Sequence, residues 1–355
     1  MTKAMSRREF LAVSMTSLGA LALTGNAIAQ GQEAPGNSLS PEQSSIDYMV
    51  LVNKQHKLPD DWEDKVEIVS FTNSEDWDVD VEVKAYEAYL KLKEDLEADG
   101  VYIDLDSAYR SVAKQQRVWD DFTVKYGEEY VKQYVAVPGF SEHHTGLALD
   151  LFLIIDGKGV YENEDMVTYP EIWEKIHAKI ADYGFILRYL PRKKIETGYS
   201  CEPWHIRYLD NPAVAREIMD AGITFEKYLG ELDPMIADCD VDYGDSDIYT
   251  DADIDSALNV LMAQFKTWKG CVMKHIAFAG DKACEDDLSY VNELRKKDTP
   301  EFTQALVLSS NFHSPSEEDA KETAWNPDTD YNGWTWHFGR TSADSAWQLL
   351  SWGFA

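Results

Sequence analysis

Apolar residues recur at helical spacing in four segments of the chain. In Glu82–Ala98, five of them (Ala85, Ala88, Tyr89, Leu92 and Leu96) fall on one helical face, and Gly100 follows. This pattern predicts an amphipathic helix that ends just before the glycine. The other predicted helices span Lys114–Tyr126, Tyr169–Tyr183 and Thr250–Trp268, with Gly184 and Gly270 after the last two.

Other segments have strand-like patterns. Val101–Leu105 alternates between apolar and other residues, as a strand does. Leu147–Ile155 is a nearly continuous apolar run interrupted by Asp150, which indicates a buried strand. Further strands are expected at Trp204–Leu209, Val272–Phe278, Thr303–Asn311, Trp334–Arg340 and Trp347–Trp352. Because helices and strands alternate without a regular βαβ rhythm, the predicted fold class is α+β.

The N-terminus carries an export pattern. Ser6-Arg-Arg-Glu-Phe-Leu11 resembles the twin-arginine signature, and an apolar stretch, Ala12–Leu23, follows it. Ala27 and Ala29 suit signal peptidase, so residues 1–29 are predicted to be a twin-arginine signal peptide cleaved before Gln30. A retained membrane anchor is the alternative. No later segment has 18 uninterrupted apolar residues, so no further bilayer span is expected.

Composition shifts divide the rest of the chain. Residues 30–45, rich in Gly, Gln, Pro and Ser, are predicted to be a linker, and residues 46–232 a globular domain. Residues 233–249 are acidic and are interpreted as a solvated linker. Residues 250–355, with a helix followed by several strands, are predicted to form a second, small α+β domain.

The acidic segment also suggests a calcium loop. Asp238, Asp240 and Asp242 have ligand-like spacing. However, Tyr243 stands where such a loop needs glycine, and Tyr249 where it needs the closing glutamate. The solvated linker is therefore the preferred interpretation.

Charge excludes one class of partner. The formal net charge is −31, and a surface this acidic repels phosphate backbones, so no nucleic-acid partner is expected. With 44% hydrophobic residues the chain can bury a core.

The four cysteines are Cys201, Cys239, Cys271 and Cys284. Outside the cytoplasm an even number permits two disulfides, in any of three pairings; Cys271 and Cys284 could close a small loop. None has C-x-x-C spacing, so a cysteine zinc site is not expected.

Two short motifs carry the chemistry. Ser141-Glu-His-His-Thr-Gly-Leu-Ala-Leu-Asp150 precedes Glu202-Pro-Trp-His205. Peptide hydrolysis by zinc needs three N or O ligands, an open position for water and a carboxylate base. His143, Asp150 and His205 could be the ligands and Glu202 the base. Alone, His143 with Asp150 could be a chance spacing, and Glu202–His205 a surface turn. Asp150 is the most informative, since a carboxylate within an apolar strand is costly unless it is paired or metal-bound.

Together these motifs resemble those of the VanY-type D-alanyl-D-alanine carboxypeptidases, zinc peptidases with a DD-peptidase/hedgehog-like fold. The resemblance covers residues 46–210 and includes Ala108-Tyr-Arg-Ser-Val-Ala-Lys-Gln115. It implies one zinc ion per chain, bound by His143, Asp150 and His205, with Glu202 as the base. It further implies that Arg110 grips the substrate carboxylate or polarises the scissile carbonyl. A surface arginine that caps a helix is the alternative for Arg110. The other cleft residues implied are Gln115, Ser141 and Trp204.

Two positions depart from the family pattern. His144 stands where relatives often have glutamine. Because neighbours on an extended segment point opposite ways, His144 is interpreted as a cleft-wall residue rather than a fourth ligand. Cys201 precedes Glu202 and is interpreted as structural or disulfide-bonded, since a thiolate ligand would close the open zinc position.

The C-terminal segment resembles small accessory domains with a cone-like α+β shape. His337 is expected to be a packed core residue rather than a ligand. The tryptophans near the end, Trp334, Trp336, Trp347 and Trp352, are expected to pack in the core, with sugar stacking in a wall-binding module as the alternative.

The expected function is removal of terminal D-alanine from peptidoglycan stem peptides by an exported D,D-carboxypeptidase. Two alternatives remain open: an L,D-carboxypeptidase that acts on tetrapeptide stems, and a catalytically silent wall-binding protein.

Overall fold

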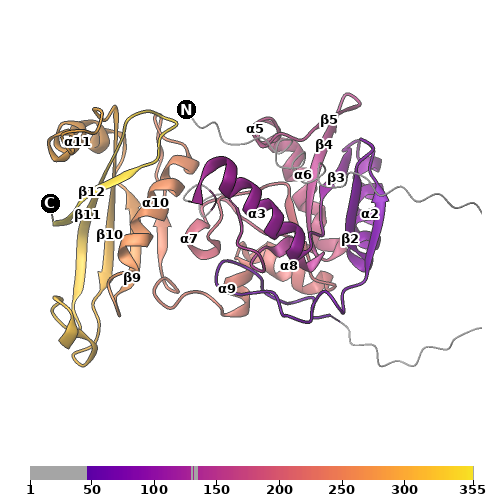
Figure 1. Cartoon of the computed structure of the whole chain (residues 1–355), viewed down its shortest axis with the longest axis horizontal. Coiled ribbons are helices and arrows are strands. Elements are labelled where there is room, and N and C mark those ends of the chain that lie inside the picture. Colours follow the sequence, from indigo (N-terminus) through magenta and orange to yellow (C-terminus); the bar gives the residue numbers. More distant parts are fainter. Residues whose placement is uncertain (1–45, 129–130, 132–134, 355) are drawn as a thin grey trace, which may run out of the picture. The chain divides into compact units, whose positions relative to one another are not determined.

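A computed structural model describes residues 46–128, 131 and 135–354 (Figure 1). The predicted signal peptide (1–29) and linker (30–45) lie outside the described residues. Among those residues, no helix is long and apolar enough to span a bilayer.

The described chain divides into two compact units. The first unit comprises residues up to Ile186 together with Trp204–Arg216, and the second comprises Leu187–Pro203 and the chain from Glu217 onward. The domain boundaries at 46–232, 233–249 and 250–355 stay a prediction.

The sheet of the first unit has the order β3-β4-β7-β6, with β5 alongside β4. Figure 1 labels β3, β4 and β5. β4 pairs with β3, β5 and β7, in each case antiparallel. The six residues from Ala148 to Leu153 are all buried, as predicted for a strand covered on both faces. The strands are β3 (Ile103–Ser107), β4 (Ala148–Ile155), β5 (Lys158–Val160), β6 (Phe185–Leu187) and β7 (His205–Tyr208).

A hairpin, β1 (Ile68–Thr72) and β2 (Asp78–Glu82), was not predicted. Asp78 and Asp80 of β2 are exposed, and its buried positions include Val79 and Val81. The alternation is therefore present, but it is short and lies among acidic residues.

Helices flank this sheet, and the predicted ones are confirmed. α2 (Val83–Ala98) buries the five apolar residues of its predicted face, and the Glu82 carboxylate caps it by accepting from Ala85 N at 2.8 Å. The predicted helix 169–183 is α6 (Pro170–Ile180) continued by the 3₁₀ turn η2 (Ala181–Tyr183). The remaining helices are α3 (Val112–Tyr126), α5 (Asn163–Met166) and α8 (Pro212–Ala221), which continues into the second unit.

The second unit holds a five-stranded sheet in the order β12-β11-β10-β9-β8. All its pairings are antiparallel except that of β8 with β9, which is parallel. The strands are β8 (Asp240–Asp242), β9 (Val272–Phe278), β10 (Gln304–His313), β11 (Asp330–Arg340) and β12 (Gln348–Phe354), so the four predicted strands are confirmed.

The acidic segment 233–249 differs from the predicted solvated linker. It contains β8, and Tyr243 and Tyr249 are buried in the core of the second unit. Aromatic residues between the aspartates, rather than the acidic composition, decide where this segment lies. Asp240 accepts from the His275 ring at 2.6 Å, and Asp238 pairs with Lys274 at 3.4 Å, so these carboxylates face His275 and Lys274 of β9.

Two helices cover opposite faces of this sheet. α10 (Asp251–Phe265) packs with Leu306 and Leu308, whereas α11 (Asp281–Leu294) packs through Val291 against Ala305. Residues 305 and 306 point to opposite faces because strand side chains alternate. The short helices of this unit are α7 (Lys194–Thr197), α9 (Phe225–Leu229) and η3 (Asp319–Glu322).

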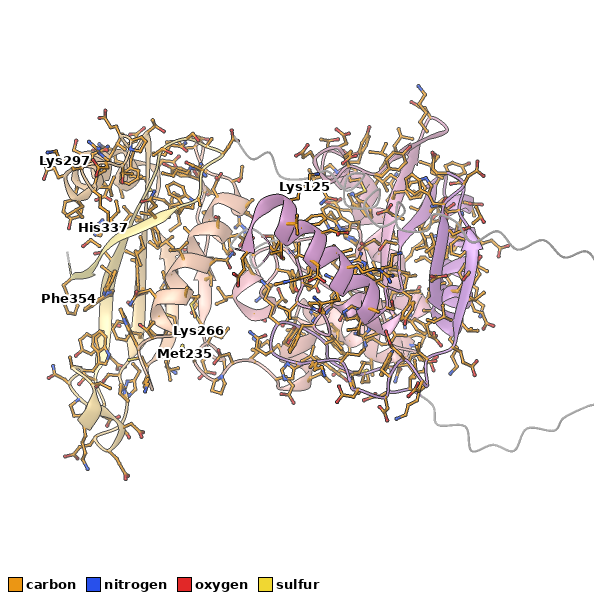
Figure 2. All side chains as sticks on the ribbon, viewed as in Figure 1. Lys125, Met235, Lys266, Lys297, His337 and Phe354 are labelled. Carbon is orange, nitrogen blue, oxygen red and sulfur yellow. The ribbon has the colours of Figure 1, made fainter. Side chains whose placement is uncertain are left out.

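The aromatic end of the chain is divided between core and surface. Trp336 and Trp347 are buried, as predicted, whereas Trp352 and Phe354 of the edge strand β12 are 41% and 64% exposed. Phe354 is labelled in Figure 2. His337 is half-buried, and its Nδ1 lies 3.0 Å from Asp287 Oδ1, so a carboxylate pair replaces the predicted core packing.

All four cysteines lie within the described residues and are free thiols. The two disulfides permitted by the even count are therefore not formed. Cys271 and Cys284 are each packed into the hydrophobic core, and the Cys284 sulfur accepts a hydrogen bond from Val307 N at 3.3 Å.

Candidate active site

The structure brings the three predicted zinc ligands together in the first unit. His143 lies on the 3₁₀ helix η1 (Glu142–Thr145), Asp150 on β4, and His205 on β7 directly opposite Asp150. One ligand atom from each residue lies within 4.8 Å of the others, and all three side chains are buried. Among the described residues this is the one cluster of at least three His, Cys, Asp or Glu that could hold a metal ion.

A left-handed glycine connects the two parts of this cluster. Gly146 has φ +73° between η1 and β4, and an added Cβ would lie 3.1 Å from Ile68 Cδ1 and 3.2 Å from Glu82 Cβ. The turn requires both a positive φ and the absence of a side chain. Only glycine meets both conditions at this close approach.

Hydrogen bonds orient the two imidazoles. His143 Nδ1 lies 2.7 Å from the Ala108 carbonyl, which can only accept, so this nitrogen carries the proton. His143 Nε2 therefore faces Asp150 Oδ2, at 3.4 Å. His205 faces Asp150 Oδ1 with Nδ1, at 2.9 Å, and its Nε2 lies 3.2 Å from Glu142 Oε2.

Glu142 is a functional candidate that the sequence analysis missed. Its second oxygen accepts from Arg207 Nη1 at 2.8 Å, and Arg207 Nη2 donates to the carbonyls of Tyr48 and Val50. A carboxylate behind a histidine ligand fixes the ring and raises its basicity. The available signal was the position of these residues next to the ligands: Glu142 precedes His143, and Arg207 follows His205 by two.

The pKa values of the two histidines are shifted in opposite directions. Burial lowers the pKa of His143, although Asp150 opposes this. Burial would also lower the pKa of His205, but hydrogen bonds with Asp150 and Glu142 raise it to about 9. The cluster thus concentrates negative charge around His205, which suits a cation.

The donor set fits zinc. Two imidazole nitrogens and one carboxylate oxygen, with a carboxylate behind one imidazole, are the donors that catalytic zinc sites use. Zn²⁺ is preferred to Mg²⁺ or Ca²⁺ because those ions favour oxygen ligands.

Arg110 lies beside this cluster with its partners fixed. Its backbone N–H donates to the His143 carbonyl at 3.0 Å, and its Nη1 donates to Gln115 Oε1 at 3.0 Å. Gln115 is buried and donates from Nε2 to the Ala136 carbonyl at 2.8 Å. Ser141, also buried, immediately precedes η1.

The prediction that His144 lies on an extended segment was wrong, because the residue belongs to the 3₁₀ helix η1. His144 is fully buried, its Nδ1 lies 2.5 Å from the Arg110 carbonyl, and its Nε2 accepts from Gly139 N at 3.1 Å. Both ring nitrogens are therefore engaged by the backbone. His144 is a brace behind Arg110, which agrees with its exclusion as a fourth ligand.

The second motif crosses the division between the units. Glu202 belongs to the second unit, where its N–H donates to the Tyr189 carbonyl at 3.2 Å. Trp204 belongs to the first unit, is buried, and accepts from Leu151 N through its carbonyl at 3.0 Å. Burial raises the pKa of the Cys201 thiol to about 12, so Cys201 stays protonated and is a poor metal ligand.

Comparisons with known proteins agree with these motifs. The model of the VanY family, described as D-alanyl-D-alanine carboxypeptidase, matches residues 78–211. A D-alanyl-D-alanine carboxypeptidase of Enterococcus faecalis is 32% identical over 217 residues, which cover 58% of this chain and 75% of that relative. The bifunctional D-Ala-D-Ala dipeptidase and carboxypeptidase VanXYC of Enterococcus gallinarum is 35% identical over 167 residues, or 46% of this chain and 83% of that protein.

A solved structure gives a similar result. A variant of the vancomycin-resistance D,D-pentapeptidase VanY, in complex with Zn(II), is 31% identical with a TM-score of 0.42; the match covers 51% of this chain and 98% of that one. The two curated relatives exceed 30% identity over at least three quarters of their own length. The chain therefore belongs to the VanY family of D-alanyl-D-alanine carboxypeptidases.

Proposed function

We propose that this protein is a zinc-dependent D,D-carboxypeptidase that removes the terminal D-alanine from peptidoglycan stem peptides. The observation that carries the proposal is the buried convergence of His143, Asp150 and His205, with Glu142 and Arg207 behind His205. Membership of the VanY family supports the reaction and the substrate class.

The three converging residues would hold the zinc ion. Zinc supplies a Lewis acid that polarises the scissile carbonyl and makes water acidic enough to lose a proton near neutral pH. When the two histidines bind zinc, His143 would donate from Nδ1 to the Ala108 carbonyl, and His205 would donate from Nε2 to the Glu142 carboxylate. Each ring thus presents its other nitrogen to the metal.

Glu202 is proposed as the general base. Its place three residues before His205 follows the family motif, and a carboxylate can accept the proton of the attacking water. The same carboxyl group then donates that proton to the departing amine of D-alanine, so the base is regenerated in each turnover.

Arg110 is proposed to bind the carboxylate at the end of the substrate. A guanidinium forks onto a carboxylate in a bidentate manner, which favours chain ends over internal peptide bonds. Gln115 and His144 hold Arg110 at its side chain and backbone, respectively. Ser141 and Trp204 are proposed to line the same cleft.

The assay that tests this proposal is mass spectrometry of stem peptides incubated with the zinc-loaded protein. We expect loss of one alanine from a pentapeptide ending in D-Ala-D-Ala, no loss from its C-terminal amide, and no loss after chelation until zinc is restored. The Glu202→Gln variant should bind one zinc ion and lose turnover. Cleavage of a tetrapeptide stem alone would show L,D-carboxypeptidase activity in place of D,D-carboxypeptidase activity. Full turnover by Glu202→Gln would refute the assignment of Glu202 as the general base.

We further infer that the protein acts outside the cytoplasm after export by the twin-arginine route. The Arg7-Arg8 pair, the apolar stretch after it and the small residues at 27 and 29 support this route. The test is fractionation of cells that express the Arg7→Lys/Arg8→Lys variant. We expect it to accumulate inside the cell, and unchanged export of that variant would contradict the route.

A further inference from the structure

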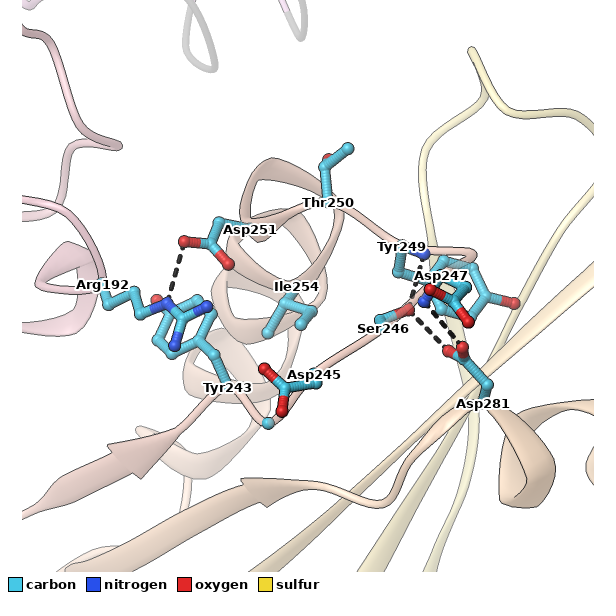
Figure 3. A pocket seen from close by; sticks show the side chains of 11 residues that line it. Arg192, Tyr243, Asp245, Ser246, Asp247, Tyr249, Thr250, Asp251, Ile254 and Asp281 are labelled. Atoms are coloured by element: carbon cyan, nitrogen blue, oxygen red, sulfur yellow. Dashed lines mark hydrogen bonds and ion pairs between the residues drawn. The ribbon is translucent and has the colours of Figure 1, made fainter. Parts of the chain in front are cut away.

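The segment that carries Glu202 belongs to the second unit, together with the C-terminal sheet. Ile195 of α7 packs against the hydrophobic core that contains α10 and β9–β11. At the surface, Arg192 Nε pairs with Asp251 Oδ2 at 2.9 Å, and its guanidinium lies over the Tyr243 ring at 5.3 Å (Figure 3). Apolar and polar contacts therefore tie this segment to the C-terminal part of the chain.

Two further hydrogen bonds lie near one another, one in the C-terminal part of the chain and one close to Glu202 in sequence. The Tyr243 hydroxyl donates to Asp255 Oδ1 at 2.6 Å, and Asp255 on α10 is 5% exposed. Lys194 Nζ donates to Ser200 Oγ at 2.7 Å. Lys194 and Ser200 both act to lower the pKa of Asp255, so this pair lies near its carboxylate. Ser200 stands two residues before Glu202, so Asp255 of the C-terminal part lies near the backbone that leads to the proposed base.

The energetic cost of this arrangement argues that it has a role besides stability. Burial raises the pKa of Asp255, although Tyr243, Lys194 and Ser200 oppose the rise. Burial likewise lowers the pKa of Lys194, opposed by the charges of Asp255 and Glu202. Interacting charges that are partly withdrawn from water are seldom more stabilising than apolar residues of equal volume, but they can fix geometry.

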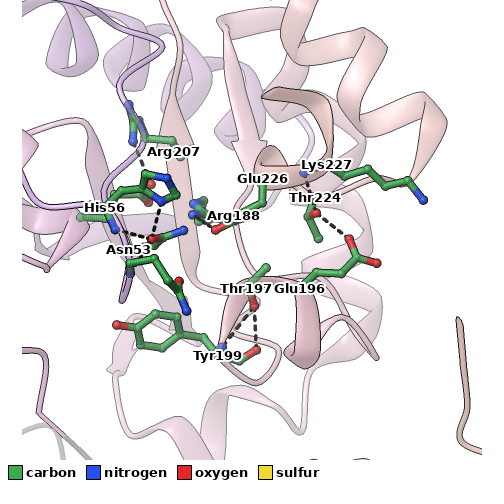
Figure 4. A network of polar contacts seen from close by, with 12 residues as sticks. Asn53, His56, Arg188, Glu196, Thr197, Tyr199, Arg207, Thr224, Glu226 and Lys227 are labelled. Atoms are coloured by element: carbon green, nitrogen blue, oxygen red, sulfur yellow. Dashed lines mark hydrogen bonds and ion pairs between the residues drawn. The ribbon is translucent and has the colours of Figure 1, made fainter. Parts of the chain in front are cut away.

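Other contacts brace the same segment from within the second unit. Thr224 Oγ1 donates to Glu196 Oε2 at 2.7 Å, and Arg188 makes a bidentate ion pair with Glu226 (Figure 4). The Tyr199 ring packs on Tyr189 with centroids 4.8 Å apart, and the Tyr189 carbonyl accepts from Glu202 N. The segment that carries Glu202 is therefore also held by contacts with Glu226 and Thr224 of the same unit.

We propose that the C-terminal domain positions the catalytic base, with Asp255 holding Ser200 and Lys194 and thereby fixing the backbone that presents Glu202. Tyr243, Asp255, Ser200 and Lys194 are positioning residues in this scheme. The inference rests on the proposed function, because it takes Glu202 as the base. In this scheme the C-terminal domain supports catalysis without having to bind the cell wall.

The test compares steady-state kinetics and zinc content of Ser200→Ala, Asp255→Ala and Asp255→Asn in the full-length protein. For Ser200→Ala and Asp255→Ala we expect kcat to fall by about tenfold or more, since small misplacements of a catalytic group are costly. KM should stay within about twofold and zinc content at one ion per chain, because all three ligands belong to the first unit. Asp255→Asn keeps a hydrogen-bond acceptor and should restore part of kcat.

Matched controls separate positioning from general destabilisation. Asp287→Ala removes another carboxylate of the same unit, the partner of His337, and Tyr249→Phe removes a buried hydroxyl bonded to the Ala305 carbonyl. Both should leave kcat unchanged, whereas Tyr243→Phe should lower it. Ser200→Ala keeps the test decisive if Asp255→Ala fails to fold.

The outcomes distinguish this inference from the proposed function. Wild-type kcat in folded Ser200→Ala and Asp255→Ala, with an inactive Glu202→Gln, would overturn the positioning role alone. Equal losses in the control variants would also overturn it. Full activity of Glu202→Gln would show that Glu202 is not the general base, and the proposed positioning role would then fail as well.

Discussion

At the scale of single residues, the most informative finding is that the proposed zinc ligands are oriented by residues that lie next to them in the sequence. Glu142 was an unassigned position of the motif, yet it faces His205 with one oxygen and Arg207 with the other. The sequence could predict which residues carry donor atoms. It could not predict this pairing, because Glu142 and Arg207 are brought together only by the folding of η1 against β7.

The first prediction concerns this carboxylate. Glu142→Ala should weaken zinc binding about 10–100-fold, because His205 loses the partner that orients its ring and raises its basicity. Glu142→Gln should weaken it less, since the amide oxygen can still accept from Nε2. Competition with a chromogenic chelator measures the affinity.

Asp104 provides the matched control for Glu142. It is a buried carboxylate of the same sheet, where it accepts from the Tyr89 hydroxyl at 2.9 Å. Asp104→Asn should lower stability without changing zinc affinity. Equal zinc affinity in Glu142→Ala and Asp104→Asn would show that Glu142 does not support the ligand.

At the scale of elements, the turn between η1 and β4 sets the distance between His143 and Asp150. Gly146→Ala should destabilise the protein more than Gly100→Ala, although the two glycines have nearly equal φ of +73° and +74°. Both substitutions incur the left-handed penalty of about 1–2 kcal/mol. Only Gly146→Ala adds overpacking against Ile68 and Glu82, which typically costs a further 1 kcal/mol or so.

Urea unfolding of the zinc-loaded variants measures this difference, and zinc content shows whether the cluster is disturbed. We expect Gly100→Ala to bind zinc normally, because nothing lies within 4 Å of its added Cβ. Equal destabilisation of the two variants would mean that the turn relaxes and that the close approach at Gly146 is unimportant.

The start of α10 gives a prediction with a pH dependence. Thr250 and Asp253 form a capping box, and Asp253 Oδ1 also accepts from Arg340 Nη1 at 2.6 Å. Burial alone would raise the pKa of Asp253, but hydrogen bonds from Thr250 and Arg340 outweigh it and lower the pKa. The stabilisation is therefore present above about pH 4, the unfolded value, and is lost as the pH falls through the folded pKa.

Asp253→Asn should accordingly cost about 1–2 kcal/mol at pH 7, and the difference from the wild type should shrink below about pH 4. Urea unfolding followed by tryptophan fluorescence at both pH values checks this, since Trp347 packs in the same core. Asp286→Asn on α11, which removes an exposed pair with Lys282, serves as the control and should have little effect. A difference that does not depend on pH would rule out the carboxylate as the source.

At the scale of the whole molecule, the sequence predicted long and strongly patterned elements well. α2, β4 and α10 follow from apolar periodicity and capping residues that are local in sequence. β8 and α11 were missed for an identifiable reason: acidic residues dominate both, and each is stabilised by a few buried residues, such as Tyr243 next to β8 and Val291 in α11. The convergence of the proposed ligands could be predicted from motifs, whereas the approach of Asp255 to Lys194 and Ser200 depends on contacts distant in sequence.

The last prediction uses the division of the chain into two units. Zinc stabilises only conformations in which its ligands converge, by about 4 kcal/mol at a thousandfold excess over Kd. All three proposed ligands belong to the first unit, and the second has a hydrophobic core of its own. Hydrogen exchange of the zinc-loaded and chelated protein should therefore show added protection in η1, β4 and β7 and unchanged protection in β9–β11. Added protection of β10 and β11 of similar size would show instead that the two units open as one cooperative structure, because exchange from a core strand requires the opening of the unit that contains it.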